Sequence, residues 1–147
     1  MTDIFPVFTR MQDQKIRLTK IRKLLVEILI RSDGPVTVSQ LLSLVHPKSP
    51  KVNKTTIYRQ LEFLIQNSLA KSVDFGDGTI RYEWDSKDHH HHLICQKCHR
   101  IESVNLTGDL TILERKITEQ KQFQILRHSL EFFGYCSRCY PVNTVKS

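Results

Sequence analysis

The sequence predicts an α+β protein with two small domains. The first is a winged helix-turn-helix domain, and the second is a small α/β domain with a four-cysteine zinc site. Two observations lead to this prediction. The first half has three stretches with apolar residues at helical spacing, followed by two alternating stretches around a glycine-rich turn. In the second half, all four cysteines fall in two Cys-x-x-Cys pairs. A length of 147 residues suits one medium domain or two small ones.

Three short helices are predicted from their capping residues and apolar periods. Thr19 is the expected N-cap of the first helix, which Gly34-Pro35 interrupts. Thr37 and Gln40 have the spacing of a capping box and open the second helix. Asn53 is the expected N-cap of the third helix. The predicted core faces contain Ile21, Leu24, Leu25, Ile28 and Leu29, then Val38, Leu41, Leu42 and Val45, then Ile57, Leu61, Leu64 and Ile65.

A β-hairpin follows the third helix. Val73 and Phe75 alternate before the Gly76-Asp77-Gly78 turn, and residues 80–84 alternate after it. Three helices followed by a two-stranded hairpin form a winged helix, which is a variant of the helix-turn-helix motif.

The polar segment 85–88 is the predicted hinge between two domains, which span residues 1–84 and 89–147. The second domain is expected to contain strands over 89–95, 101–106 and 123–133, and a helix over 109–120.

The four cysteines predict a structural zinc site. Two Cys-x-x-Cys pairs supply four thiolates, and closed sites of this kind are structural rather than catalytic. The expected ligands are Cys95, Cys98, Cys136 and Cys139. A redox dithiol and a pair of disulfides are the alternatives. No segment has the apolar length of a membrane helix or a signal peptide, so we expect a cytoplasmic protein, in which metal-bound thiolates are favoured over disulfides.

Four consecutive histidines, His89 to His92, precede the first cysteine pair. Side chains on a strand alternate between faces, so His90 and His92 should share one face while His89 and His91 share the other. Imidazoles two residues apart on a strand can converge on one ion, and a solvent-exposed cluster is the alternative. His128 lies in the apolar stretch 123–133, where a polar residue needs a partner; it is either a core histidine or a metal ligand.

Positive charge is concentrated at the start of the chain. Residues 1–59 contain eleven Lys or Arg and four acidic residues, which accounts for the whole net charge of +7. A cluster without acids is formed by Lys15, Arg17, Lys20, Arg22 and Lys23. Such a cluster is typical of a phosphate-binding surface, and a solvated helix face is the alternative.

These residues, in this order, resemble the ferric uptake regulator family of bacterial metal-dependent repressors over nearly the whole chain. The matching stretches are Arg17-Leu18-Thr19-x-x-Arg22, Thr56-Ile57-Tyr58-Arg59-x-Leu61, Arg81-Tyr82-Glu83, His89 to Cys98, and His128-Ser129-Leu130-x-x-x-Gly134-x-Cys136-x-x-Cys139. The resemblance implies that the winged helix binds DNA and that the α/β domain dimerises. It also implies a homodimer on an inverted-repeat operator, and zinc held by the four cysteines.

The resemblance also implies two further metal sites. Glu83, His90 and His92 match the regulatory hinge site, and His89, His91 and His128 match a second site, with Asp109 or Glu114 as its candidate carboxylate. The chain departs from the family at Pro35, where a histidine is frequent, and at Ser103, where an acid is frequent. Glu102 is one position out of phase. The carboxylate position of the second site aligns with Thr111.

We therefore expect a metal-responsive DNA-binding regulator, a repressor of metal-uptake genes. Its cofactors would be structural Zn²⁺ and a second divalent metal, Fe²⁺ or Zn²⁺, with Mn²⁺ also open. The expected DNA contacts are Lys15, Arg17, Thr55, Thr56, Tyr58 and Arg59. A peroxide-sensing or zinc-sensing member of the family is an alternative. A zinc-storage module leaves the winged helix unexplained. A zinc enzyme is disfavoured because the sequence lacks His-x-Glu and His-Glu-x-x-His motifs.

Overall fold

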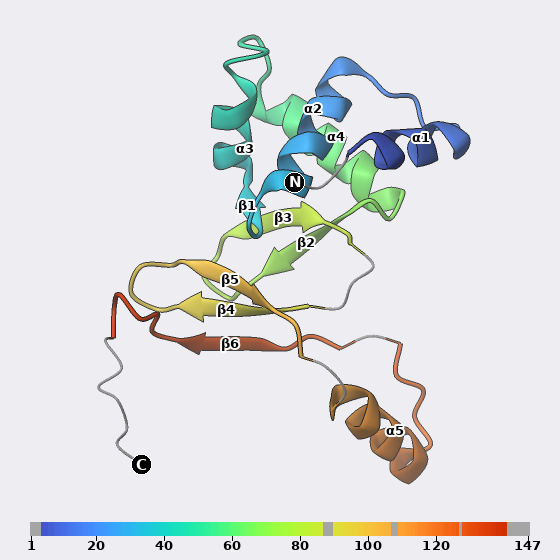
Figure 1. Ribbon diagram of the computed structural model, residues 1–147, viewed down its shortest axis with the longest axis vertical. Coiled ribbons are helices and arrows are strands. Elements are labelled where there is room, and N and C mark those ends of the chain that lie inside the picture. The colour runs from blue at the N-terminus through green and yellow to red at the C-terminus, as the bar shows by residue number, and fades with distance from the viewer. Residues whose placement is uncertain (1–3, 87–89, 107–108, 127, 141–147) are drawn as a thin grey trace. The chain divides into compact units, whose positions relative to one another are not determined.

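The computed structural model describes residues 4–86, 90–106, 109–126 and 128–140 (Figure 1). The chain folds into two compact units, unit 1 from Met1 to Ser86 and unit 2 from Lys87 to Ser147. This division falls inside segment 85–88, which the sequence predicts as the hinge. None of the helices in the described part of the chain has both the length and the apolar character needed to cross a membrane.

Residues 4–86 of unit 1 form four helices: α1 (Phe5–Asp13), α2 (Lys20–Arg31), α3 (Val38–Val45) and α4 (Lys54–Gln66). The three predicted caps are present. The side chains of Thr19 and Asn53 accept hydrogen bonds from the backbone N–H groups of Arg22 and Thr56, and Thr37 forms a complete capping box with Gln40. Each such cap contributes about 1 kcal/mol to the stability of its helix.

Helix α1 was not predicted from the sequence. It has Pro6 in its first turn, where the missing N–H of proline carries no cost. Met11 is its only buried residue, while Phe5 is exposed. A nine-residue helix with one buried side chain does not show the repeated apolar spacing by which a longer helix is recognised.

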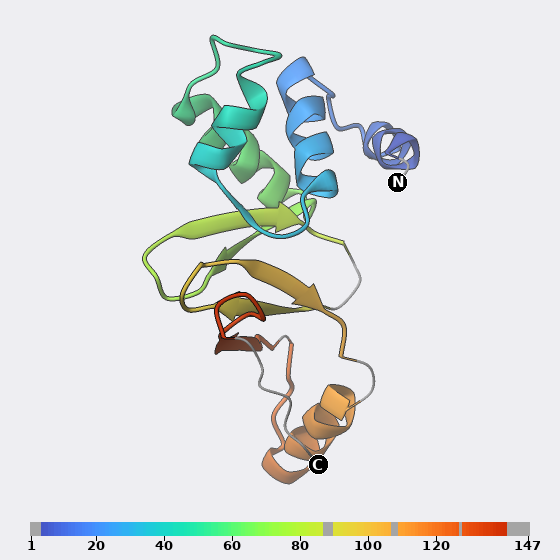
Figure 2. The ribbon, with the colours of Figure 1, turned by 60° about the vertical axis from the view of Figure 1, so that its left-hand side comes forward.

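The predicted wing is a hairpin of β2 (Ala70–Asp74) and β3 (Ile80–Trp84), drawn in light green in Figure 2. The short strand β1 (Val36–Thr37) extends it, and the strand order is β1-β3-β2. Gly76 and Gly78 take positive φ values of 77° and 75° in the turn. Asp77 receives two hydrogen bonds from Arg81, at 3.0 and 2.7 Å, which lower the pKa of its carboxyl to about 2. These bonds close the tip of the wing.

The core of unit 1 lies where α2, α3 and α4 meet the wing. Its fully buried side chains are Met11, Leu25, Val26, Leu41, Val45, Ile57, Leu61 and Leu64. Complete burial of such a side chain stabilises the fold by roughly 1.5–3 kcal/mol. Ile65, which the helical period places on the core face, is instead 37% exposed. The predicted winged-helix fold is otherwise confirmed.

The described residues of unit 2 form a three-stranded sheet and one helix. Strand β4 (His91–Cys95) lies between β5 (Ile101–Val104), which is antiparallel to it, and β6 (Glu131–Gly134), which is parallel. The helix α5 (Asp109–Lys121) connects β5 to β6 and ends one residue later than predicted. The α/β fold expected for this half is confirmed.

The last strand of unit 2 is much shorter than predicted. The sequence favoured a strand over 123–133, but β6 begins only at Glu131. In the described part of the preceding segment the chain is irregular, and Phe123 and Leu126 are exposed to 63% and 86%. The alternating apolar pattern therefore does not mark residues that this sheet buries. The strand predicted over 101–106 also stops early, at Val104.

Candidate metal centres and nucleic-acid surface

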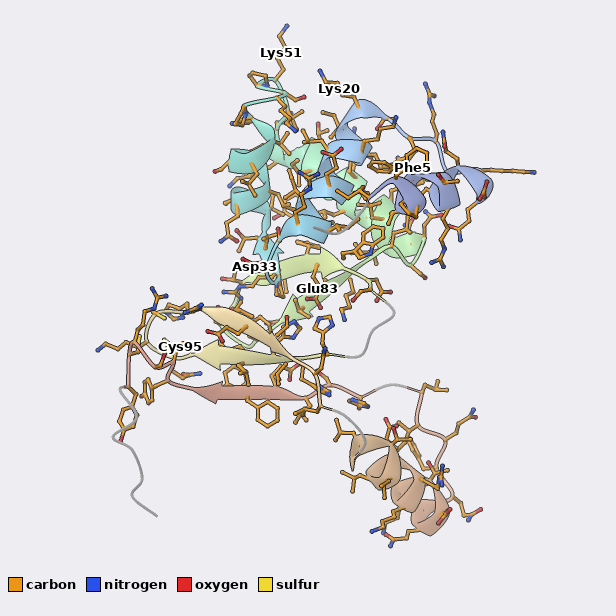
Figure 3. All side chains as sticks on the ribbon, in the orientation of Figure 1. Phe5, Lys20, Asp33, Lys51, Glu83 and Cys95 are labelled. Atoms are coloured by element: carbon orange, nitrogen blue, oxygen red, sulfur yellow. The ribbon has the colours of Figure 1, made fainter. Side chains whose placement is uncertain are left out.

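The four cysteines come together at one end of the sheet in unit 2. Cys95, labelled in Figure 3, is the last residue of β4 and lies opposite Gly134. The parallel strand β6 therefore brings Cys136 back to the same end of the sheet. All four sulfur atoms lie within 4.8 Å of one another, and the Sγ atoms of Cys98 and Cys136 are 3.7 Å apart. Four converging sulfurs are the donor set that tetrahedral zinc prefers.

The two Cys-x-x-Cys pairs form similar tight turns. The backbone N–H of His99 donates to the carbonyl of Cys95 at 2.9 Å, and the N–H of Tyr140 donates to the carbonyl of Cys136 at the same distance. The two turns are linked by a bond from the backbone N–H of Cys136 to Sγ of Cys95, at 3.4 Å. Backbone groups thus hold the sulfurs in place.

The same backbone groups polarise the sulfurs. The N–H groups of Cys136 and Cys98 lower the pKa of the Cys95 thiol to about 5. Hydrogen bonding to Cys98, together with burial, raises the pKa of Cys139 to about 12. A dication bound by all four sulfurs would require each of them to be deprotonated, so metal binding here would release protons.

Strand β4 separates the described histidines of the run into two sets. The rings of His90 and His92 meet edge to face, with centroids 5.1 Å apart. His91 points to the opposite face and stacks on His128, with centroids 5.4 Å apart and ring planes 25° apart. This is the alternation expected of a strand. His89 lies outside the described residues.

His128 also contacts a carboxylate of α5. Its Nδ1 atom lies 2.6 Å from Oε1 of Glu114, so His91, His128 and Glu114 form a continuous chain of polar side chains. The predicted position of His128 inside a strand is wrong, because β6 begins three residues later. Of the two candidate carboxylates, Glu114 is the one placed here. Thr111 is exposed, and the side chain of Asp109 lies outside the described residues.

Glu83 belongs to unit 1, where it lies near the end of β3 (Figure 3). It is buried, and its Oε1 atom lies 3.1 Å from Nζ of Lys71 on the neighbouring strand. The sequence reasoning did not single out Lys71. The hairpin turn would have identified it, because strands that pair symmetrically about Asp77 place residue 71 opposite residue 83.

Pro35 and Ser103 are the two positions at which the sequence departs from the family pattern of metal ligands. Pro35 is buried just before β1 and offers no ligand atom. Ser103 lies opposite His92 in β5. Its neighbour Glu102 lies opposite Leu93 and pairs with Arg100 at 3.0 Å. Glu102 is therefore on the other face of the strand from Ser103, as its sequence position indicates.

Helix α4 presents a polar face to solvent. Thr55, Tyr58 and Arg59 are exposed, whereas Ile57, Leu61 and Leu64 point into the core. Thr56 differs from the other expected DNA contacts. Its backbone N–H and its hydroxyl both bond Oδ1 of Asn53, at 2.9 and 3.1 Å. Both of its donors are engaged in the helix cap, so Thr56 contributes to the position of α4 rather than offering a donor to a phosphate.

Arg22 is not part of an exposed basic surface. It is only 8% exposed, and its guanidinium lies 3.6 Å from the centre of the Phe63 ring. Nε donates to Oε1 of Gln60 at 3.1 Å, and another nitrogen donates to the carbonyl of Arg17. Burial and the nearby Arg17 lower its pKa. Arg22 therefore fastens α2 and the segment before it to α4, which corrects its place in the predicted cluster.

Lys15 and Arg17 lie exposed in the connection between α1 and α2. Lys15 has a φ of 59°, and the N–H groups of Lys15 and Ile16 bond the carbonyls of Gln12 and Met11. This is a Schellman motif, whose left-handed position favours glycine. Ser68 occupies the same position after α4, with a φ of 54° and matching bonds from Ser68 and Leu69.

The two left-handed residues allow a paired test of Lys15. Lys15→Gly and Ser68→Gly should each stabilise unit 1 by about 0.5–1 kcal/mol, because glycine adopts a positive φ without steric cost. If Lys15 binds phosphate, Lys15→Gly alone should weaken DNA binding and reduce its salt dependence. Urea unfolding and DNA titration at several salt concentrations measure both effects. Equal DNA affinity of the two variants would show that Lys15 makes no such contact.

Comparison with known proteins gives one consistent family. Residues 13–133 match the model of the ferric uptake regulator family. The ferric uptake regulation protein of Bacillus subtilis is 30% identical over 134 residues, covering 88% of this chain and 89% of that protein. The peroxide-responsive repressor PerR of Staphylococcus epidermidis is 27% identical over 124 residues, covering 84% and 81%.

Solved structures show the same fold. The Helicobacter pylori ferric uptake regulator Fur superposes with a TM-score of 0.76 at 20% identity, covering 92% of this chain and 90% of that chain. A zinc-bound manganese uptake regulator superposes with a TM-score of 0.68 at 26% identity, covering 85% and 94%.

Proposed function

The chain belongs to the ferric uptake regulator family of DNA-binding, metal-binding transcription regulators, and we propose that it is a repressor of metal-uptake genes. In this proposal it acts in the cytoplasm as a homodimer on an inverted-repeat operator, when a divalent metal occupies the hinge site. The observation that carries the proposal is that side chains able to bind a metal ion lie in the sequence on both sides of the boundary between unit 1 and unit 2. Glu83 lies before that boundary, and His90 and His92 lie after it.

The proposed hinge site is Glu83, His90 and His92. The metal would supply a positive charge that all three side chains can coordinate, and one carboxylate with two imidazoles suits Fe²⁺, Zn²⁺ or Mn²⁺. Two structural facts support these ligands: Glu83 is a buried carboxylate, and His90 and His92 share one face of the chain. Metal would act only by its higher affinity for the arrangement of the units that fits DNA.

Helix α4 would be the recognition helix. Tyr58 and Arg59 lie on its exposed face, where Arg59 can bond a guanine or a phosphate and Tyr58 can contact a base or sugar. Thr55, Lys15 and Arg17 would contact the DNA backbone. In a dimer the two helices would enter successive major grooves about 34–36 Å apart.

Homodimerisation is supported by the apolar side chains that unit 2 leaves exposed. They lie on α5 and on the segments before and after it: Leu106, Ile112, Leu113, Ile117, Phe123, Leu126, Phe132 and Phe133. Exposed apolar groups in such numbers are typical of a protein–protein interface. A second copy of unit 2 would bury them.

The two other proposed sites lie within unit 2. Structural zinc would be held by the four cysteines, whose sulfurs already converge. The second site would use His91 and His128, with Glu114 as its carboxylate and His89 as a further ligand. The Helicobacter pylori relative is described as having three functional metal-binding sites, the number proposed here.

The experiment first selects the DNA sequences that the protein binds and then measures how its affinity for them depends on metal. Zinc-loaded dimer is incubated with a random duplex library, and the recovered DNA is titrated with Fe²⁺, Mn²⁺ and Zn²⁺. We expect an inverted repeat and an affinity that rises about 100-fold with the cognate metal. Glu83→Gln should remove the metal response, and Glu102→Gln, a carboxylate paired with Arg100, should keep it. Equal affinity with and without every metal would contradict the proposal.

Peroxide sensing is the second candidate, because the alignment with a peroxide-responsive repressor covers 84% of this chain, at 27% identity. In that case Fe²⁺-loaded protein exposed to hydrogen peroxide should lose DNA binding, and mass spectrometry should find added oxygen on a histidine of the hinge site. Mn²⁺-loaded protein should be resistant.

A further inference from the structure

Lys71 lies directly opposite Glu83 in the wing hairpin. The two residues are register partners on β2 and β3, and Nζ lies 3.1 Å from Oε1. The carboxylate side chain is 7% exposed, whereas the lysine side chain is 38% exposed. An ammonium that reaches from the surface thus neutralises part of the charge of a buried carboxylate.

This ion pair bears on metal binding, because Glu83 is a proposed ligand of the hinge site. A buried carboxylate is costly unless a positive charge compensates it. In the metal-free protein Lys71 contributes that charge, and in the loaded protein the metal would contribute it. We propose that Lys71 competes with the metal for Glu83 and thereby sets the metal concentration at which the regulator responds. The inference rests on the proposed role of Glu83.

The geometry permits this competition in either of two ways. If the metal takes Oε1, the ammonium must withdraw, and its exposure gives it a path to solvent. If the metal takes the other oxygen, a dication and an ammonium lie a few ångströms apart and repel each other. Both routes weaken metal binding. Lys71 is not itself a ligand, since a charged ammonium has no lone pair to donate.

The competition is specific to the register of the hairpin. Strand pairing places Ser72 opposite Tyr82 and Val73 opposite Arg81, so these two neighbours of Lys71 cannot take its place. Arg81, the nearest basic residue along β3, is bonded to Asp77 at the tip of the wing. Lys71 is therefore the basic residue that the structure aligns with the carboxylate.

The test is the Mn²⁺ affinity of the full-length, zinc-loaded protein, measured by competition with a chromophoric chelator. Lys71→Met should bind Mn²⁺ about tenfold more tightly, as expected when one like charge is removed near a partly solvated cation. Lys71→Arg should keep the wild-type affinity because it keeps the charge. Lys20→Met, an exposed lysine of α2, lowers the net charge equally and should also leave the affinity unchanged. An unchanged or weaker affinity of Lys71→Met overturns the inference.

A second variant, Lys71→Gln, tests the same inference if Lys71→Met does not fold without metal. Lys71→Gln removes the charge but keeps a polar side chain, so it should also bind Mn²⁺ more tightly than the wild type. Its metal-free Tm should fall, and saturating Mn²⁺ should restore it. A wild-type affinity for Mn²⁺ in this variant again overturns the inference.

Glu83→Gln separates this inference from the proposed function. If Glu83→Gln binds Mn²⁺ as the wild type does, Glu83 is not a ligand and the proposed hinge site fails, and the inference about Lys71 fails with it. If Glu83→Gln loses Mn²⁺ binding while both neutral Lys71 variants bind it normally, the hinge site stands and only the competition is wrong.

Discussion

Replacement of Cys136 by serine is expected to release one zinc ion per chain and to unfold unit 2. This unit has little core of its own: among its described residues only Ile94 and Cys95 are buried apolar side chains. Zinc bound by four cysteines contributes about 10–16 kcal/mol, which is far more than such a core can supply. Cys136 is also the residue whose N–H bonds Cys95 and joins the two turns.

Metal analysis, circular dichroism and sedimentation together measure this effect. The Cys136→Ser protein should lack zinc, lose the signal of the unit 2 strands and sediment as a monomer, while unit 1 keeps its helices. Ser137→Ala is the matched control, because Ser137 is exposed between the two cysteines of the same turn. It should bind zinc and dimerise as the wild type does. A folded, zinc-free dimer of Cys136→Ser would refute the structural role.

Replacement of Arg59 by alanine is expected to abolish specific DNA binding without changing the fold. Arg59 lies on the exposed face of α4, and the core residues Ile57 and Leu61 are on the opposite face. A good bidentate contact between arginine and guanine is worth about 1–3 kcal/mol. Because a dimer would lose two such contacts, or about 2–6 kcal/mol, the affinity should fall by about 30-fold or more.

Glu62→Ala is the control for this variant. Glu62 is exposed less than one helical turn beyond Arg59, and its removal should keep or increase DNA affinity. Both variants should keep the zinc content, dimer mass and Tm of the wild type. A large loss of Tm in Arg59→Ala would mean that the side chain is structural and that α4 is wrongly assigned as the recognition helix.

Much of unit 1 could be predicted because its signals are local. Thr19, Thr37 and Asn53 cap their own helices, and the turn around Asp77 fixes the register of its own two strands. Each of these features depends on residues a few positions apart. The same is true of the cysteine pairs, whose spacing indicates a metal turn before any fold is known.

The features that could not be predicted depend on distant contacts. Arg22 has the sequence context of a surface basic residue, and only its contacts with Gln60 and Phe63 on α4 show that it is buried. The apolar pattern around Leu126 resembles that of a strand, but a strand requires a partner, and β4 pairs only from Glu131 onward. Glu114 is one of two candidate carboxylates, and only the fold brings it within 2.6 Å of His128.

The parallel pairing of β4 with β6 also has a kinetic consequence. Strands β4 and β5 are neighbours in the chain and can pair quickly, but β6 must return across roughly 35 residues, and closing a loop of that length carries an entropic cost before any contact forms. The first cysteine turn lies within the fast-forming hairpin and the second lies beyond β6. A zinc ion captured early by Cys95 and Cys98 would therefore hold only two of its four sulfur ligands until β6 forms, so the return of β6 would govern how quickly a newly made chain completes the site.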